Sequence, residues 1–232
     1  HLAAAGYSGV ELGFRHISPL EPARLRDLLE QHSLQLVASH IGGNLEDTAQ
    51  ADSEKRVIDE VVEYLKQMGA KRLMVSGLRF KDEDQFEADF ASLNRSAQFC
   101  RENGIDLLYH NHNWEFAEDA RVMTAILNRG CEELGICPDI GWVFKGGANV
   151  TGFLNSARGR IGAIHFKDFA SLEPGVDTVC LGDGIVPLRQ AAEWVQTNKP
   201  DLWVIAEQDK AEGSAEDATA RNAAFLKECF LA

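Results

Sequence analysis

Short apolar runs rich in β-forming residues alternate along the chain with longer segments of helical periodicity. The runs predict strands at 9–12, 34–40, 72–77, 105–112, 134–139, 161–168 and 203–207. Between them, apolar residues recur about every 3.6 positions, which predicts amphipathic helices. These helices occupy roughly 21–31, 53–70, 83–102, 119–128, 150–157, 187–197 and 215–229.

Strict alternation of strand and helix predicts a parallel sheet whose strands are joined by helical crossovers. The opening residues HLAAAGYSG are typical of the end of a helix, so a strand and helix before His1 would bring the visible strands to eight. We therefore expect an α/β fold, a (β/α)8 TIM barrel that forms a single domain over residues 1–232, with its first βα unit missing or truncated at the N-terminus. Such a barrel has an open seam, which we expect the full protein or a partner to cover.

A doubly wound sheet is the competing architecture. However, no GxGxxG or GxxxxGK[ST] pattern follows an early strand. Polar residues instead stand at the ends of many different strands, which is what the C-terminal face of a barrel requires. The pattern therefore favours the barrel.

Composition is that of an ordinary globular protein, with 45% hydrophobic and 25% charged residues. No apolar run approaches the ~18 residues of a membrane span, and no targeting segment is visible. The five cysteines form no CxxC pair, so neither a disulfide framework nor a thiolate zinc site is indicated. We expect a cytoplasmic protein. Without such an apolar run we expect no membrane as partner. The net charge of −13 repels phosphate backbones, so we expect no nucleic acid as partner either, while a homo-oligomer stays open.

Acids and histidines gather at the predicted strand ends. They are Glu11, His40, His110, His112, Asp139, His165, Lys167, Asp168 and Glu207. Because alternate residues of a strand point to the same side, His110 and His112 share a face, and so do His165 and Lys167. These side chains would line the mouth of the barrel.

A divalent cation with open positions for substrate needs carboxylates and imidazoles that converge from separate strands, and Asp139, His165 and Glu207 fit such a set. Oxygen-rich sites favour Mn²⁺ or Mg²⁺, and an added histidine suits Mn²⁺, Co²⁺ or Zn²⁺. Each residue also has a plainer interpretation. Asp139 can cap the turn after its strand, Glu207 can pair with a nearby Lys or Arg, and His112 with Glu115 can form a polar strand exit.

The chain resembles a known family, the xylose-isomerase-like TIM barrels of the sugar phosphate isomerase/epimerase superfamily. The resemblance runs over nearly the whole chain, through GYSGVEL, ASHIG, YHNHNWEF, PDIGWVFKGG, IHFKDF, LGDGIVP and VIAEQD. The combination of YHNHxxEF with HxKDF and EQD is most similar to the branch that acts on keto-sugars, keto-glycosides or inososes.

This resemblance implies one divalent metal held by a Glu, Asp, His, Glu set, with Mn²⁺ as the first choice and Mg²⁺, Co²⁺ or Zn²⁺ as alternatives. Asp139, His165 and Glu207 would take the last three places. The strand position that carries the first Glu holds His110 here, and the nearest glutamate is Glu115. Either His110 ligates the metal or Glu115 folds back to it, and we favour Glu115.

The resemblance also implies an enzyme, an isomerase or epimerase that acts on a keto-sugar or related polyol through an enediolate intermediate. The metal would polarise the carbonyl, and Glu207 or His112 would remove the adjacent proton, with His110 also facing the substrate. Loss of a hydroxyl or glycosidic oxygen from the same intermediate would instead make the protein a dehydratase or lyase acting on a keto-glycoside or inosose. A non-catalytic sugar-binding subunit stays open as well, and so does an endonuclease IV-like DNA-repair enzyme, although the net charge disfavours the latter.

The remaining strand-end residues would contact the small-molecule sugar substrate. His40 is a candidate contact. Lys167 and Asp168 would hold sugar hydroxyls or orient a metal-binding histidine, or else form a surface ion pair. Trp114 and Trp142 would stack on a face of the sugar ring or pack at the barrel rim.

Overall fold

The computed structural model describes residues 1–42, 51–211 and 213–231. Its strands are β1 (Gly9–Gly13), β2 (Gln35–Gly42), β3 (Arg72–Ser76), β4 (Asp106–His110), β5 (Leu134–Cys137), β6 (Ile164–Phe166), β7 (Asp168–Phe169), β8 (Thr178–Val179) and β9 (Val204–Ala206). Its longer helices are α3 (Pro22–Gln31), α4 (Ala51–Met68), α5 (Glu83–Glu102), α6 (Ala117–Arg129), α8 (Val150–Ala157), α9 (Leu188–Asn198) and α10 (Ala215–Phe230). Shorter elements are α1 (Leu2–Ala5), α2 (Phe14–Ile17), the 3₁₀ turn η2 (Trp114–Phe116) and α7 (Ile140–Lys145).

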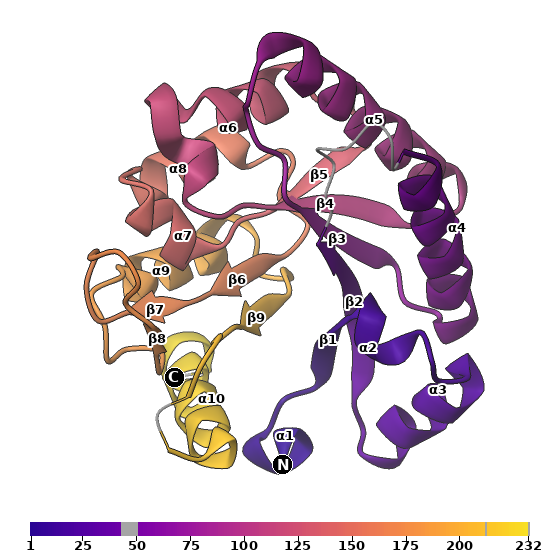
Figure 1. Cartoon of the computed structure of the whole chain (residues 1–232). Coiled ribbons are helices and arrows are strands. Elements are labelled where there is room, and N and C mark those ends of the chain that lie inside the picture. The colour runs from indigo at the N-terminus through magenta and orange to yellow at the C-terminus, as the bar shows by residue number, and fades with distance from the viewer. Residues whose placement is uncertain (43–50, 212, 232) are drawn as a thin grey trace.

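The strands form a ring that is open on one side. Strands β1 to β5 pair in sequence order as a parallel sheet, and β6 pairs in parallel with β9. Two isolated parallel bridges, Ile136 to Ile161 and Asp139 to His165, connect the two groups. Figure 1 shows the ring with its helices outside and an opening between β1 and β9. The predicted α/β barrel is therefore confirmed, and the doubly wound sheet is wrong.

The inside of the ring is filled by a small apolar layer directly beneath the polar strand ends. Its buried members are Ala38, Met74, Leu108, Cys137 and Ala163, packed by Trp203 and Ile205. Alternate residues of a strand share a face. The residues two positions further along the chain therefore form the next layer toward the C-terminal ends of the strands. They are His40, Ser76, His110, Asp139, His165 and Glu207.

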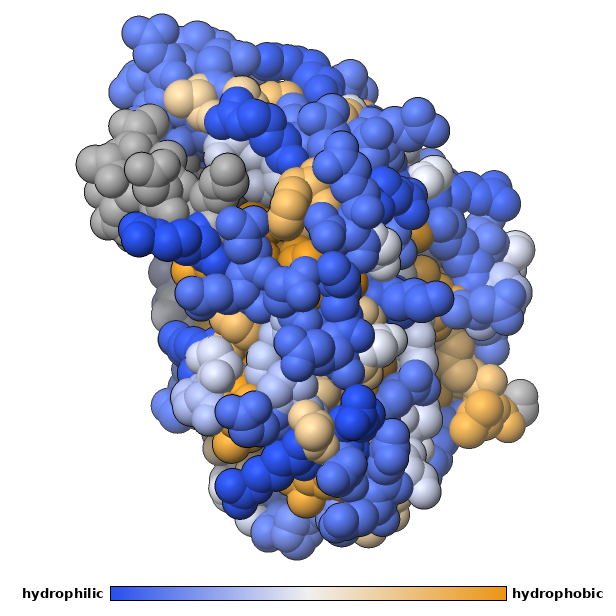
Figure 2. Space-filling model, turned by 90° about the vertical axis from the view of Figure 1, so that its right-hand side faces the viewer, coloured by the Kyte–Doolittle hydropathy of each residue, from blue (hydrophilic) through white to orange (hydrophobic). Residues whose placement is uncertain are grey.

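The outer helices turn their apolar faces to the sheet. In α3, Leu25 and Leu29 are buried, and in α4, Val61 and Leu65 are buried at the same helical spacing. Figure 2 views the molecule from the side of these two helices and shows a mainly hydrophilic face, with smaller apolar areas between the polar groups. Among the described helices, none is long and apolar enough to cross a bilayer.

The strand limits differ from the predicted ones near the polar residues. Strand β4 ends at His110 and not at His112. The carboxylate of Glu115 accepts a hydrogen bond from the backbone N–H of His112 at 2.8 Å, which turns the chain out of the strand and into η2. Strand β6 similarly ends at Phe166, before Lys167. The short helix α7 and the antiparallel pair of β7 with β8 were not predicted at all.

Contacts between the first and last helices lie at the outer end of the opening. The Nζ of Lys227 in α10 donates to the backbone oxygen of Ala5 in α1 at 2.8 Å. The hydroxyl of Tyr7 donates to the backbone oxygen of Thr219 at 3.4 Å. Figure 1 shows α1 beside α10 at this point. Helix contacts thus hold the two sides of the opening together, although β1 and β9 do not pair.

Candidate metal and substrate site

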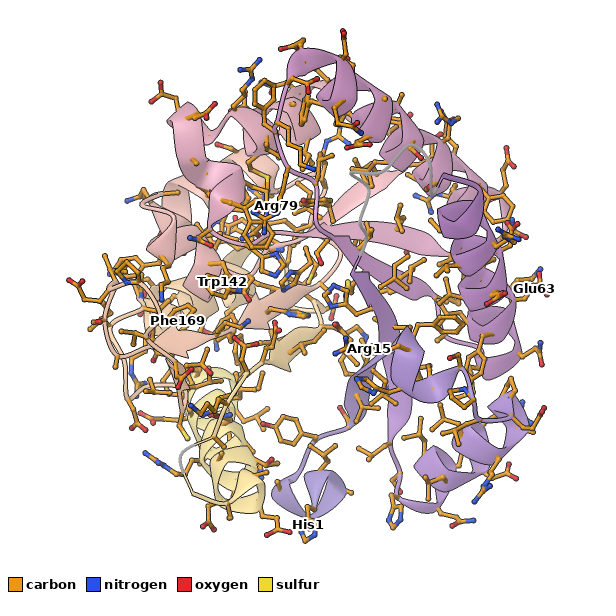
Figure 3. All side chains as sticks on the ribbon, in the orientation of Figure 1. His1, Arg15, Glu63, Arg79, Trp142 and Phe169 are labelled. Carbon is orange, nitrogen blue, oxygen red and sulfur yellow. The ribbon has the colours of Figure 1, made fainter. Side chains whose placement is uncertain are left out.

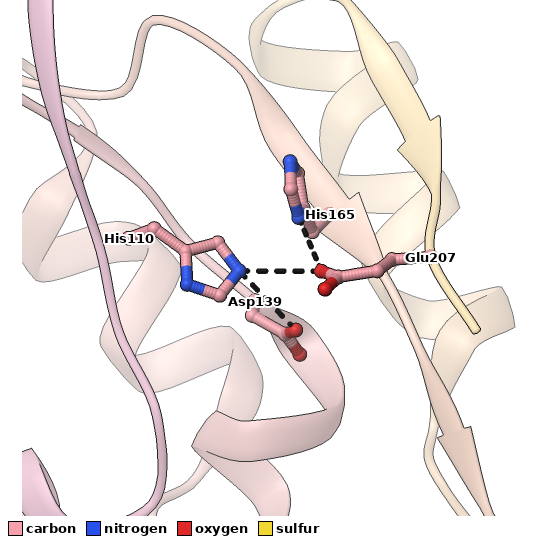
Figure 4. Close-up of side chains that lie close together, drawn as sticks. All are labelled: His110, Asp139, His165 and Glu207. Carbon is pink, nitrogen blue, oxygen red and sulfur yellow. Dashed lines mark hydrogen bonds and ion pairs between the residues drawn. The ribbon is translucent and has the colours of Figure 1, made fainter. Parts of the chain in front are cut away.

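Four side chains with metal-binding chemistry converge at the C-terminal ends of four strands. His110, Asp139, His165 and Glu207 each offer one ligand atom, and these atoms all lie within 4.8 Å of one another. His110 ends β4 and His165 lies in β6, while Asp139 and Glu207 follow β5 and β9. Figure 4 shows the four side chains pointing toward one another from these elements. The ring of strands therefore creates one cluster from residues far apart in the sequence.

Close contacts within the cluster all involve the carboxylates. The Oε2 of Glu207 lies 2.5 Å from Nδ1 of His165 and 3.3 Å from Nε2 of His110. The Nε2 of His110 is also 3.5 Å from Oδ2 of Asp139. His110, Asp139 and His165 are fully buried, and Glu207 is partly exposed at the mouth. Burial opposes ionisation of Glu207, but the two imidazoles lower its pKa well below the ordinary value.

The two carboxylate oxygens of Asp139 have different surroundings. It is the N-cap of α7, because its Oδ1 accepts a hydrogen bond from the backbone N–H of Trp142 at 2.9 Å. The side chain of buried Asn111 fixes its backbone, accepting from the N–H of Asp139 at 3.0 Å. Among the described residues, Oδ2 has no hydrogen-bond partner and only the longer contact to His110 and one to Lys167, also 3.5 Å. This oxygen is available to a ligand.

The donor set fits a single divalent metal. Two ligands on opposite sides of such an ion stand about 4 Å apart, so atoms that already lie within 4.8 Å of one another need only a small contraction. A buried carboxylate oxygen without a hydrogen-bond partner, such as Oδ2 of Asp139, is costly unless a cation or donor satisfies it. Two carboxylates and two imidazoles suit Mn²⁺, Co²⁺ or Zn²⁺ better than Mg²⁺, which prefers oxygen.

Glu115 does not belong to this cluster. Its side chain is fully buried. Its Oε1 accepts from the hydroxyl of Tyr109 at 2.7 Å and its Oε2 from the N–H of His112 at 2.8 Å. Burial raises the pKa of this carboxyl above the ordinary value. The expectation that Glu115 folds back to the metal does not fit this arrangement, because both of its oxygens hold the end of β4, whereas His110 lies among Asp139, His165 and Glu207.

Lys167 is a buried cation at the edge of the cluster. Its Nζ lies 3.2 Å from Oε1 of Glu207, 3.2 Å from Oδ1 of Asp209 and 3.5 Å from Oδ2 of Asp139. Burial alone would lower its pKa, but the three carboxylates raise the pKa of Lys167 above its ordinary value. The plainer interpretation of Lys167 as part of a surface ion pair is wrong, since its side chain is only 2% exposed.

His112 lies beside the cluster with a free nitrogen. Its ring stacks on Trp114 at a centroid distance of 4.1 Å and lies 5.2 Å from the ring of His110. Among the described residues its buried Nδ1 has no hydrogen-bond partner. Burial, together with the charges of His110 and Lys167, lowers the pKa of His112 to about 3. The imidazole is therefore neutral near pH 7.

The two tryptophans flank His112 but are held differently. Trp114 donates its Nε1–H to the backbone oxygen of Leu78 at 3.2 Å, and the guanidinium of Arg79 lies 3.8 Å over its ring. Trp142 lies 5.8 Å from the ring of His112, and its buried Nε1 has no partner among the described residues. In Figure 3 the labelled Trp142 lies toward the centre of the ring, whereas Glu63 points outward from α4.

The carboxylate of Asp168 binds backbone N–H groups. Its two carboxylate oxygens accept hydrogen bonds from four N–H groups at 2.9 to 3.1 Å. The donors are Phe169, Gly182, Gly184 and Val186. The residue anchors the LGDGIVP loop, and it neither contacts the cluster nor leaves an oxygen for a sugar hydroxyl. From the sequence, Asp168 and its neighbour Lys167 were expected to hold sugar hydroxyls or orient a histidine together. In the structure only Lys167 lies beside the cluster.

His40 contacts Glu11, a residue that also contacts the cluster and that was given no role in the sequence prediction. The Nδ1 of His40 lies 3.4 Å from Oε1 of Glu11, and its Nε2 lies 3.0 Å from the hydroxyl of Ser76. The other oxygen of Glu11 lies 2.8 Å from Nε2 of His165. Burial opposes its ionisation, but His165 and His40 lower the pKa of Glu11 below its ordinary value. Glu11 was visible as a strand-end acid, whereas Asn111 and Asp209 stood inside the YHNHxxEF and EQD motifs without a predicted role.

Comparisons with known proteins agree with this architecture. A protein-family model described as a xylose isomerase-like TIM barrel matches residues 1–229. An inosose dehydratase from Lacticaseibacillus casei is 26% identical over 251 residues, which cover 92% of this chain and 82% of that protein.

Two solved structures share the fold at low sequence identity. An L-ribulose 3-epimerase superposes with a TM-score of 0.80 at 15% identity, covering 98% of this chain and 86% of that one. The structure of an IOLI protein with a bound zinc atom superposes with a TM-score of 0.79 at 13% identity, covering 98% and 90%. With the family model matching almost every residue, the chain belongs to the xylose isomerase-like TIM barrel family.

Proposed function

We propose that the protein is a divalent-metal-dependent enzyme that removes the proton next to the carbonyl of a cyclic keto-polyol and then eliminates a neighbouring hydroxyl as water. The observation that carries the proposal is the cluster of His110, Asp139, His165 and Glu207, four metal-binding side chains with ligand atoms within 4.8 Å of one another. The inosose dehydratase relative supports dehydration of an inosose as the first reaction to test. Isomerisation or epimerisation, which the family resemblance put first, shares the same initial step.

The four clustered side chains would hold the metal, with Mn²⁺, Co²⁺ or Zn²⁺ as its identity. When bound, such an ion supplies Lewis-acid polarisation of a substrate carbonyl, worth several kcal/mol of stabilisation for the charge that develops on its oxygen. The four side chains would hold the ion and leave it free to bind oxygen atoms of the substrate. The zinc in the structure of the IOLI protein supports metal binding by a protein of this fold.

His112 is the base in this proposal. Its imidazole is neutral, its Nδ1 is buried without a partner among the described residues, and its ring lies 5.2 Å from that of His110. Glu207 is less suited, because its carboxylate is engaged by His165, His110 and Lys167. As His112 takes the proton, the C–H electron pair forms a double bond to the carbonyl carbon and the carbonyl π electrons move onto its oxygen. Those electrons then re-form the carbonyl, the double bond moves between the α- and β-carbons as the β-carbon–oxygen bond breaks, and the leaving hydroxyl takes the proton from the imidazolium to depart as water.

The surrounding residues would bind the sugar and exclude solvent. Lys167 is fixed by Glu207 and Asp209, so its remaining N–H can donate to a substrate oxygen beside the cluster. The indole of Trp142 lies near both Lys167 and His112, and offers a flat apolar wall for a polyol ring. Trp114 acts by supporting the ring of His112 from its other side.

Epimerisation is the second candidate, and a specific arrangement favours it. The rings of His40 and His112 both lie 5.2 Å from the ring of His110, so two imidazoles flank the cluster. A reaction that takes a proton from one face of a carbon and returns it to the other needs two such groups. The L-ribulose 3-epimerase of the same fold is consistent with this reaction.

The test uses 2-keto-myo-inositol in D₂O with the protein loaded with Mn²⁺, Co²⁺ or Zn²⁺, followed by NMR and by ultraviolet absorbance of the enone product. We expect metal-dependent loss of the α-hydrogen signal with formation of the enone, abolished by EDTA and in His112→Gln. Deuterium exchange without the enone would support epimerisation in place of dehydration. Absence of exchange across a panel of keto-polyols and keto-sugars with every metal would refute the proposal.

A further inference from the structure

Glu11 is a buried carboxylate that contacts the cluster from the strand at the open edge of the barrel. Its side chain is 10% exposed, and its Oε2 lies 2.8 Å from Nε2 of His165. The pairing register of β1 with β2 shifts between Val10 and Glu11. The extra residue is Val37 of β2, because Val10 pairs with Leu36 and Glu11 pairs with Ala38. A bulge of this kind interrupts the ladder and increases the local twist, and at this point of the ladder the carboxylate of Glu11 reaches one nitrogen of one histidine.

The contact determines which nitrogen of His165 can face a metal. Nδ1 points into the cluster, 2.5 Å from Oε2 of Glu207, while Nε2 points to Glu11. A neutral imidazole that binds a metal through Nδ1 carries its proton on Nε2. A carboxylate that accepts this proton fixes the tautomer and the ring orientation, and it makes the ligating nitrogen more basic.

The second histidine of the cluster has no such support. The Nδ1 of His110, which faces away from the carboxylates, is buried without a hydrogen-bond partner among the described residues. Glu11 is itself held in place, because its Oε1 lies 3.4 Å from Nδ1 of His40, whose Nε2 lies 3.0 Å from the hydroxyl of Ser76. A chain of contacts thus runs from β3 through β2 and β1 to His165 in β6.

We propose that Glu11 is a positioning residue of the metal site, which holds His165 as the Nε2–H tautomer with Nδ1 toward the metal and thereby sets the affinity for the ion. The inference rests on the proposed function, since it assumes that the cluster binds a metal. Residues of this kind change metal affinity by about 10- to 100-fold when they are replaced. The strand beside the opening then has a role in the chemistry as well as in the fold.

The first experiment is a calorimetric titration of the metal-free protein with Zn²⁺. Glu11→Gln keeps the shape of the side chain but removes its charge, and we expect Zn²⁺ affinity to fall by about 10- to 100-fold with one ion still bound per chain. Glu30→Gln, which removes an exposed carboxylate from α3, serves as the matched control and keeps the original affinity. Thermal unfolding of the metal-free variants separates a change in the site from a loss of folding.

The second experiment needs no variant. Long-range ¹H–¹⁵N spectra of the Zn²⁺-loaded protein report which imidazole nitrogen carries the proton, and we expect Nε2–H for His165. Unchanged affinity in Glu11→Gln, or a Zn²⁺-loaded His165 protonated on Nδ1, would overturn the inference and leave the proposed function standing. An unsubstituted protein that binds no Zn²⁺, Mn²⁺ or Co²⁺ would overturn both.

Discussion

His110 and Glu115 are close in the sequence, but their side chains have different surroundings. The imidazole of His110 lies among the carboxylates of Asp139 and Glu207. The carboxylate of Glu115 is engaged by the hydroxyl of Tyr109 and the backbone N–H of His112. We infer that the first of these residues binds the metal and that the second shapes the turn after β4.

Substitution of these two residues separates the two roles. We expect His110→Ala to weaken metal binding strongly, because one of the four clustered side chains is lost. Glu115→Gln keeps metal binding but replaces one acceptor with a donor in a buried position, which lowers the free energy of unfolding by about 1–3 kcal/mol. Metal titration and urea unfolding of both variants measure these effects. Metal retained in His110→Ala and lost in a folded Glu115→Gln would place Glu115 in the ligand set.

The sequence was sufficient to single out Asp139, His165 and Glu207, because each follows an apolar run in a chain whose strands all end at the same face. It could not separate His110 from Glu115. That choice depends on the turn between them, where a backbone N–H and a buried hydroxyl compete for the carboxylate. The hydrogen bonds of Glu115 with the hydroxyl of Tyr109 and the N–H of His112 leave no periodic pattern in the sequence.

At the scale of elements, the short helix α7 fixes the orientation of Asp139. The helix begins directly after that residue, which caps it, and Gly141 in its first turn packs against the backbone of Lys167. A Cβ at Gly141 would lie 2.6 Å from the backbone oxygen of Lys167. Because real contacts are longer, only glycine lets the cap of α7 and the end of β6 approach this closely.

We therefore expect Gly141→Ala to lower the free energy of unfolding by about 1–3 kcal/mol, the usual cost of overpacking, and to weaken metal binding by displacing Asp139. Gly159→Ala is the matched control, because a Cβ there meets no atom within 4 Å, and its effect should stay within about 0.5 kcal/mol. Urea unfolding and metal titration report both quantities. If both variants had the same free energy of unfolding and the same metal affinity, the close approach of α7 to β6 would contribute to neither stability nor metal binding.

The helices that sequence patterns predicted are those long enough to show a period. Helices such as α5 and α10 bury a repeated apolar face. Helix α7 spans Ile140–Lys145, too few residues for a helical period to be distinguished from an apolar loop. The pair of β7 with β8 is likewise short, and it exists because Asp168 gathers backbone N–H groups from the following loop.

At the scale of the molecule, the barrel is open between β1 and β9. Among the described residues, β1 pairs only with β2, and β9 pairs only with β6. A cavity of about 1430 Å³ extends along this opening and reaches Glu11, His165 and Glu207. The expectation that further chain or a partner covers the seam stays a prediction, as do a single domain and a homo-oligomer.

Hydrogen exchange measures this opening directly. Strand β4 is paired on both sides, whereas β9 is paired on one, so amides of β9 should exchange through smaller openings and be less protected than those of β4. Mass-spectrometric exchange of the native protein gives this comparison. If β9 and β4 are equally protected, the free edge of β9 is covered in solution. Light scattering would then test for a second copy of the chain.

The proposed function depends on a single divalent metal bound by two imidazoles and two carboxylates at the mouth of the barrel. The most direct measurement is an anomalous difference map from crystals of the protein grown with Mn²⁺. We expect one strong peak per chain, within bonding distance of His110, Asp139, His165 and Glu207 and away from Glu115. A peak at any other group of residues, or no peak at a saturating Mn²⁺ concentration, would contradict it.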